Sequence, residues 1–155
     1  MGQLGKIYGC KVIGIAGGPE KCSFVKDILK FDDCIDYKAG NLNDTLKIVC
    51  TNGIDVYFEN VGGEVSKAIA PLLNKGSRVP ICGFISQYNA EDMLKVETPF
   101  HVFGKIKPKP EHRFFVVTEW MDQWEKATED LSCLYFFGHY TILVFYCLRI
   151  LGYLV

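Results

Sequence analysis

Short apolar runs alternate with amphipathic segments through most of the chain. The runs, several of them rich in β-branched residues, predict buried strands at 10–16, 34–37, 54–58, 77–85 and 113–118. Apolar residues at helical spacing predict helices at 2–8, from Pro19 to about residue 31, and at 42–50, 64–76 and 119–131. Asn43 is the expected N-cap of the third helix. Pro71 lies inside the fourth, which should therefore kink or stop early.

Strands that alternate with helices of about ten to fifteen residues are typical of a parallel sheet covered by helices on both faces. The predicted fold class is therefore α/β, with a doubly wound, Rossmann-type parallel sheet. Ligands of such sheets bind outside the carboxyl ends of the strands. Glycines and polar residues follow the predicted strands in the stretches GGPEK, DYK, ENVGG and CGFISQYN. A cofactor is expected at these strand ends.

Composition and charge change this picture little. The chain has 155 residues, an apolar fraction of 49% and a net charge of −1, which suit one globular domain. It lacks the long basic blocks that mark nucleic-acid binding, so no nucleic-acid partner is expected. Its seven cysteines form no C-x-x-C pair and do not cluster with the histidines, so we expect reduced, buried thiols and no metal site. Because no signal peptide opens the chain, a cytoplasmic location is expected.

Lys21 stands one turn into a predicted helix, after a strand and the pair Gly17-Gly18. The first N–H groups of a helix have no partner inside it and bind anions readily. Dinucleotide-binding sheets usually carry an acidic residue after the second strand, which binds the ribose hydroxyls and selects NAD. Here glycines leave room for a 2′-phosphate and Lys21 supplies a countercharge, a pattern that favours NADP. A solvated lysine in a first turn is the alternative.

Other strand ends carry residues suited to orienting a cofactor. The stretch NVGG at residues 60–63 would let the backbone approach a flat ligand, although glycine pairs also make ordinary turns. Tyr37 and Tyr88 could each offer a hydroxyl, or could pack with one end in water. No carboxylate pair, Ser/His/Asp set or Cys/His nucleophile stands out. Hydride transfer fits this pattern, because the cofactor then carries the chemistry and the protein orients it.

An ordered series of stretches resembles the zinc-free medium-chain dehydrogenase/reductases of the prostaglandin reductase and 2-alkenal reductase kind. The matching stretches are GQLGKIYGCKVIGIAGGPEKC, IDYKAGNLNDTL, GIDVYFENVGGEV and SRVPICGFISQYN, with a weaker match at FFVVTEWMDQWEKATEDL. They imply an NADP-binding Rossmann domain over residues 1–131. The resemblance also implies an enzyme that uses NADPH to reduce the carbon–carbon double bond of small α,β-unsaturated ketones and aldehydes. Members of the family are often homodimers.

The resemblance also implies roles for individual residues. Lys21 and Tyr37 would bind the adenosine 2′-phosphate end of the cofactor, and Asn60 would contact the cofactor. The residues expected to line the nicotinamide are Cys82, Gly83, Phe84, Ile85, Ser86, Gln87, Tyr88, Phe115, Val116 and Val117. Tyr88 matches the catalytic tyrosine near the substrate carbonyl, where a hydroxyl would stabilise a developing enolate.

Two departures from the family lead to an alternative function. The family's first Rossmann strand and its pyrophosphate-binding glycine loop precede the residues that match GQLGK, and no G-x-G-x-x-G stands in this chain. The sheet is therefore expected to be incomplete and marginally stable, because each unpaired buried backbone group costs about 1 to 3 kcal/mol. The substrate-binding domain is not recognisable either. A truncated, catalytically inactive fragment that binds nucleotide weakly, or has an interaction or membrane-tethering role, is the alternative.

Residues 132–155 form an apolar tail that departs from the family. A run of this length reaches the roughly 20 residues that cross a bilayer. We interpret it first as a replacement terminus, second as a membrane anchor and third as a segment that packs over the sheet. Membrane association is therefore expected only through residues 132–155.

Overall fold

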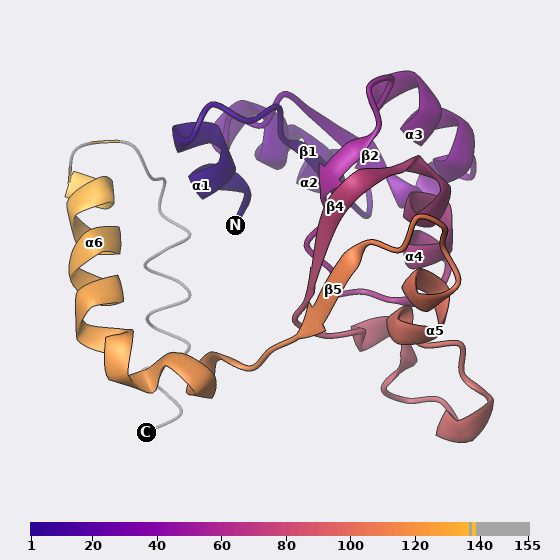
Figure 1. Ribbon diagram of the computed structural model, residues 1–155. Coiled ribbons are helices and arrows are strands. Elements are labelled where there is room, and N and C mark those ends of the chain that lie inside the picture. Colours follow the sequence, from indigo (N-terminus) through magenta and orange to yellow (C-terminus); the bar gives the residue numbers. More distant parts are fainter. Residues whose placement is uncertain (137, 139–155) are drawn as a thin grey trace. The chain divides into compact units, whose positions relative to one another are not determined.

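The computed structural model describes residues 1–136 and 138. The chain divides into two units. The first consists of Met1–Cys34 together with the chain from Val117 onward, and the second consists of Ile35–Val116. Figure 1 labels helices and strands of both units and colours the chain along its sequence.

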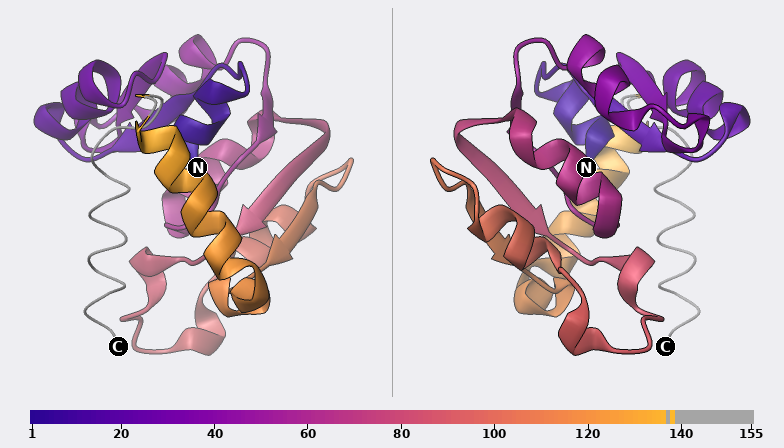
Figure 2. Two further views of the ribbon diagram at one scale, coloured as in Figure 1. Left: turned by 90° about the vertical axis from the view of Figure 1, so that its left-hand side faces the viewer. Right: turned by 90° about the vertical axis from the view of Figure 1, so that its right-hand side faces the viewer.

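The first unit begins with helix α1 (Gly2–Ile7), strand β1 (Ile13–Ala16) and helix α2 (Pro19–Ser23), which continues as a π-helical turn over Phe24–Ile28. Strand β1 pairs with β2 (Asp33–Asp36), along which the chain passes into the second unit. A Cβ at Gly14 would lie 2.7 Å from the side chain of Val25, so a glycine in β1 lets the helical segment pack closely. After Val117, a 3-10 segment (Val117–Gln123) leads into α6 (Trp124–Phe136), a continuous helix in Figure 2.

The second unit is built on a parallel three-stranded sheet. Its strands are β3 (Ile54–Val56), β4 (Leu73–Ile81) and β5 (Glu111–Phe114), and β4 lies in the middle. The two views of Figure 2 show β5 running beside β4. The α-helices of this unit are α3 (Leu42–Val49), α4 (Gly63–Ile69) and α5 (Pro99–Gly104). Short 3-10 turns occupy Tyr37–Ala39, Ala70–Leu72, Ile85–Gln87 and Met93–Lys95.

The core of the second unit lies between β4 and the helices α4 and α5. Val79 and Ile81 of β4 are fully buried, and they pack with Val102 and Phe103 of α5. Ala70, directly after α4, completes this cluster. The buried side chains of β4 therefore pack against the helical segments, and the loop that follows β4 starts from a well-packed part of the unit.

The structure confirms the α/β class and the parallel sheet, and it corrects several predicted boundaries. Helix α4 ends at Ile69, so the early stop expected from Pro71 is confirmed, and a kinked helix that continues to residue 76 was the wrong alternative. Pro71 has no N–H for a helical hydrogen bond, so the chain tightens into a 3-10 turn and becomes extended at Leu73. Strand β4 accordingly begins at Leu73 rather than at residue 77 and ends at Ile81 rather than at residue 85. Strands β1, β3 and β5 are shorter than predicted.

Two helix starts also differ from expectation. The N-cap of α3 is Asn41, not Asn43. Helix α5 was not predicted at all, and it begins with a capping box in which Thr98 and His101 exchange hydrogen bonds. Pro99 occupies its first position, where a missing N–H costs nothing.

The cysteines and the apolar tail bear on two further predictions. Cys10, Cys82 and Cys133 are exposed, so the prediction of buried thiols was wrong for them, whereas Cys22 is buried. Cys147 lies outside the described residues.

Within residues 1–136 and 138, no helix is long and apolar enough to cross a membrane. Most of the predicted tail lies outside this part of the chain, and α6 includes residues 132–136.

Candidate functional site

Two loops leave the carboxyl ends of β3 and β4 and are hydrogen-bonded to each other. The first comprises residues 59–63 and the second residues 82–88. The N–H of Ile85 donates to the carbonyl of Asn60 at 3.1 Å. Ser86 donates twice to the carbonyl of Val61, from its N–H at 3.0 Å and from its hydroxyl at 2.6 Å. Parallel pairing of β3 with β4 thus brings together residues that are more than 20 positions apart in sequence.

A side-chain oxygen from each loop lies close to the backbone of Gly83. A Cβ at Gly83 would lie 2.5 Å from the hydroxyl oxygen of Tyr88 and 2.9 Å from Oδ1 of Asn60. Only a glycine lets these two polar atoms approach the backbone so closely. Asn60 and Tyr88, both proposed from the sequence as site residues, therefore lie next to each other.

The hydroxyl of Tyr88 is held by its own loop. The N–H of Phe84 donates to this oxygen at 3.2 Å, and the two aromatic rings pack edge to face with centroids 5.3 Å apart. The tyrosine remains 54% exposed, so its ring is fixed while its surface stays open to a ligand. In the described part of the chain, no acceptor engages the proton of this hydroxyl.

Phe115 and Val116 lie close to the start of the second loop. The N–H of Phe115 donates to the carbonyl of Ile81 at 3.1 Å, which continues the pairing of β5 with β4. Its ring lies 6.1 Å from that of Phe58, and Val116 is exposed. Val117, the third predicted residue of this group, is exposed and begins the second segment of the first unit.

Glu59 is a buried carboxylate at this site that the sequence analysis missed. It is fully buried, and its Oε1 accepts hydrogen bonds from the N–H groups of Val61 and Gly62, both at 2.8 Å. The hydroxyl of Tyr57 donates to the same oxygen at 3.2 Å, and the hydroxyl of Ser66 donates to Oε2. Burial and the nearby carboxylate raise the pKa of Tyr57, so its hydroxyl remains a donor. The sequence offered one signal for this role: Glu59 is a charged residue that follows an apolar run and precedes a glycine turn.

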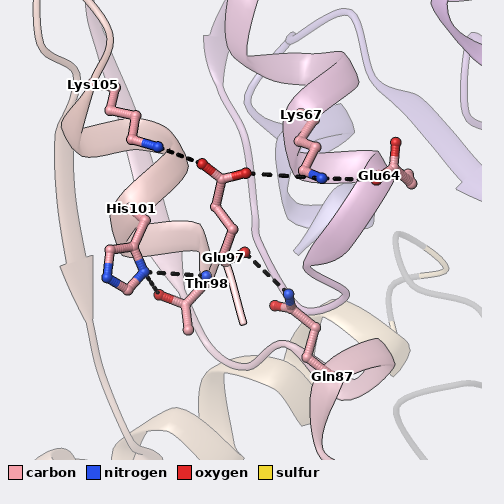
Figure 3. A network of polar contacts seen from close by, with 7 residues as sticks. All are labelled: Glu64, Lys67, Gln87, Glu97, Thr98, His101 and Lys105. Carbon is pink, nitrogen blue, oxygen red and sulfur yellow. Dashed lines mark hydrogen bonds and ion pairs between the residues drawn. The ribbon is translucent and has the colours of Figure 1, made fainter. Parts of the chain in front are cut away.

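Gln87 connects the second loop to the start of α5. Its Nε2 donates to the carbonyl oxygen of Glu97 at 3.0 Å, as Figure 3 shows. Its Oε1 is buried, and among the described residues it has no hydrogen-bond partner. A Cβ at Gly62 would lie 2.6 Å from this oxygen, so the side chain of Gln87 closes against the first loop.

The carboxylate of Glu97 forms a surface ion-pair network with two lysines. It lies 2.5 Å from Nζ of Lys105 and 3.8 Å from Nζ of Lys67, which also pairs with Glu64 (Figure 3). The hydrogen bond from Lys105 lowers the pKa of Glu97. These pairs are exposed, so they contribute little to the stability of the fold.

Lys21 belongs to the first unit and borders an open hollow there. The hollow measures about 360 Å³ and is lined by Ala16, Glu20, Lys21, Phe24, Val25 and Leu29. The turn before it is Gly17-Gly18, and Gly18 adopts a φ of 98°, which an L-residue rarely adopts. Among the described residues, no hydrogen bond or ion pair engages the ammonium of Lys21. Tyr37, its predicted partner, is exposed in the second unit, at the start of a 3-10 turn.

The thiols and acidic groups of the described residues do not suit a metal ion. No three His, Cys, Asp or Glu side chains gather there with the spacing of metal ligands. Burial and the neighbouring Cys22 thiol raise the pKa of Cys34 to about 12, so that sulfur stays protonated.

Three comparisons relate the chain to known proteins. A family model described as "Zinc-binding dehydrogenase" matches residues 1–127. The chain is 48% identical over 93 residues to an NADPH-dependent curcumin reductase of Escherichia coli, which covers 60% of this chain and 27% of that protein. It is 37% identical over 131 residues to the (+)-pulegone reductase of Mentha piperita, which covers 83% of this chain and 37% of that protein.

A solved structure has the same fold. The crystal structure of CurA from Vibrio vulnificus in complex with NADPH superimposes with a TM-score of 0.81 at 43% identity, over 90% of this chain and 42% of that one. The chain therefore spans well under half the length of these relatives. The match over residues 1–127 shows that the chain belongs to the family described as zinc-binding dehydrogenases. Within this family it belongs to the group of medium-chain dehydrogenase/reductases that lack zinc and include the enone reductases.

Proposed function

We propose that the chain provides the NADP-binding part of a reductase that acts on the carbon–carbon double bond of α,β-unsaturated ketones and aldehydes. The observation that carries this proposal is the convergence of Asn60 and Tyr88 over Gly83, at the carboxyl end of a parallel sheet. Relatives named as NADPH-dependent curcumin reductase and (+)-pulegone reductase support it. In this proposal the nucleotide-binding domain extends over residues 1–131 and the apolar tail over residues 132–155.

The adenosine end of the cofactor would bind in the first unit. The hollow beside Lys21 has mostly apolar walls, which suit a flat adenine ring, and the ammonium provides a countercharge for a 2′-phosphate. Gly17 and Gly18 carry no side chain and no charge that would repel that phosphate. Tyr37 would contact the same end of the cofactor.

The nicotinamide end would lie against the loop of residues 82–88. Because Gly83 has no side chain, the Tyr88 hydroxyl and the Asn60 amide lie against its backbone, and these two polar groups would face the nicotinamide. Phe115, Val116 and Val117 would cover the ring with apolar surface. These residues orient the cofactor and exclude water from it.

Tyr88 would act on the substrate. NADPH, when bound, supplies the hydride that adds to the double bond. The Tyr88 hydroxyl accepts the Phe84 N–H and can donate its own proton to the carbonyl oxygen of the substrate, where negative charge develops. A hydrogen bond accepted by an oxygen also strengthens the bond that the same hydroxyl donates.

The test uses the full chain. Calorimetric titration should give micromolar binding of NADPH and clearly weaker binding of NADH. Addition of an α,β-unsaturated ketone should then consume NADPH, whereas the corresponding saturated ketone should not. Absence of binding to both nucleotides would overturn the proposal and favour the inactive fragment, and binding without turnover would restrict it to a nucleotide-binding role.

A further inference from the structure

Glu59 contacts both loops of the candidate site. Its carboxylate accepts the N–H groups of Val61 and Gly62 in the first loop. Its backbone carbonyl accepts the N–H of Cys82 at 2.8 Å and that of Gly83 at 3.3 Å in the second loop. One residue therefore supplies acceptors for four backbone donors, two in each loop.

The surroundings of Glu59 keep the carboxylate in one position. Its own N–H donates to the carbonyl of Pro80 at 3.0 Å, which aligns it with the end of β4. Tyr57, which precedes Glu59, donates to Oε1, and Ser66, which follows it, donates to Oε2. The Tyr57 ring packs against Phe103 in the core, with centroids 6.0 Å apart. Both oxygens of the buried carboxylate therefore accept hydrogen bonds. One of the donors, Tyr57, packs in the core of the second unit.

The turn that Glu59 holds has a conformation which needs such support. Gly62 and Gly63 both have positive φ angles, 77° and 61°. Without the Glu59 carboxylate, the buried N–H of Gly62 would lose its only hydrogen-bond partner among the described residues. The carboxylate of Glu59 therefore determines where the turn places Asn60 and the loop that is bonded to it.

We propose that the Glu59 carboxylate positions the nicotinamide end of the site, acting through the turn that carries Asn60 and not by contact with the cofactor. This inference rests on the proposed function, and it adds a prediction of its own. Loss of the Glu59 carboxylate should impair binding at the nicotinamide end and spare binding at the adenosine end, which lies in the unit of Lys21.

The experiment compares two ligands on the full chain. NADPH reports on both ends of the site, and 2′,5′-ADP reports on the adenosine end alone. Glu59→Ala should weaken NADPH about tenfold and leave 2′,5′-ADP within about twofold of the wild-type affinity. Glu59→Gln should retain most of the NADPH affinity, because an amide oxygen still accepts both backbone N–H groups. Glu64→Ala is the matched control, since Glu64 is an exposed carboxylate on α4, and it should leave both affinities unchanged.

A second variant covers the case in which Glu59→Ala does not fold. Ser66→Ala removes the hydroxyl that donates to Oε2 of Glu59 and changes no residue of either loop. It should show the same selective loss of NADPH affinity.

The outcomes separate the two proposals. If the wild-type chain binds neither ligand, the proposed function fails. If it binds both, and Glu59→Ala or, where that variant does not fold, Ser66→Ala weakens both equally or neither, the role of Glu59 is overturned, because a merely structural effect has no preference for the nicotinamide end.

Discussion

The N–H of Phe84 donates a hydrogen bond to the hydroxyl oxygen of Tyr88 across 3.2 Å, and this contact orients a tyrosine that is otherwise half exposed. The two residues lie in one short loop after β4, so the contact is local. It leaves the hydroxyl proton available for a ligand, as the proposed reaction requires.

Tyr88→Phe should therefore slow reduction of an α,β-unsaturated ketone. Loss of one donor to a developing oxyanion lowers kcat about a hundredfold. The affinity for NADPH should change by less than about twofold, because the ring and its packing on Phe84 remain. Steady-state kinetics and calorimetry on the same preparation measure both quantities. An unchanged kcat would exclude Tyr88 from the chemistry.

Lys21→Ala should weaken NADPH much more than NADH. The two cofactors differ by the 2′-phosphate, and only that group would meet the Lys21 ammonium. We expect a loss of about tenfold or more for NADPH and little change for NADH. Lys21→Arg keeps the positive charge and should bind NADPH far better than the alanine variant. Equal losses for the two cofactors would show that Lys21 does not bind the phosphate.

Phe103→Ala should strongly destabilise the second unit. The side chain is fully buried in the cluster with Val79 and Ile81, and its removal leaves a cavity. Phenylalanine-to-alanine changes of this kind cost about 3 to 5 kcal/mol. Leu94→Ala is the control, because Leu94 is 98% exposed and its loss should cost less than about 0.5 kcal/mol. Urea denaturation followed by circular dichroism measures both, and similar midpoints for the two variants would contradict the packing described.

Asp32 should make the first unit more stable at neutral than at acid pH. Hydrogen bonds from Lys6 at 2.7 Å and from the N–H of Val12 at 2.6 Å lower the pKa of Asp32 below its ordinary 3.8. The unfolded chain therefore takes up a proton at a higher pH than the folded chain. The stabilisation is present above pH 3.8 and is lost as the pH falls through the folded pKa.

The corresponding experiment compares the wild-type chain with Asp32→Asn. Thermal unfolding from neutral pH down to about pH 2.5 should show a stability difference that is largest at neutral pH and shrinks on acidification. A difference that stays constant over this range would mean that the ion pair with Lys6 contributes nothing.

Local sequence pattern was enough to predict the alternation of strands and helices and the glycine-rich ends of the strands. These features depend on local periodicity, which is why α1 and α3 lie close to their predicted ranges, whereas α2 ends at Ser23 and only its π-helical continuation reaches Ile28. The early stop of α4 at Pro71 was among the two outcomes predicted for that helix, because the restriction belongs to proline itself. Helix α5 escaped prediction because its segment is short and begins with a capping box rather than a clear apolar period.

Which polar groups meet depends on the tertiary structure. Glu59 is charged, and its burial depends on donors from Val61, Gly62 and Ser66 that the turn and α4 bring to it. Tyr88 and Asn60 were each proposed from the sequence, but their convergence on Gly83 depends on the parallel pairing of β3 and β4, which places both loops at the same edge of the sheet. Local pattern specifies where an element begins and ends, whereas the meeting of side chains depends on contacts between residues far apart in the chain.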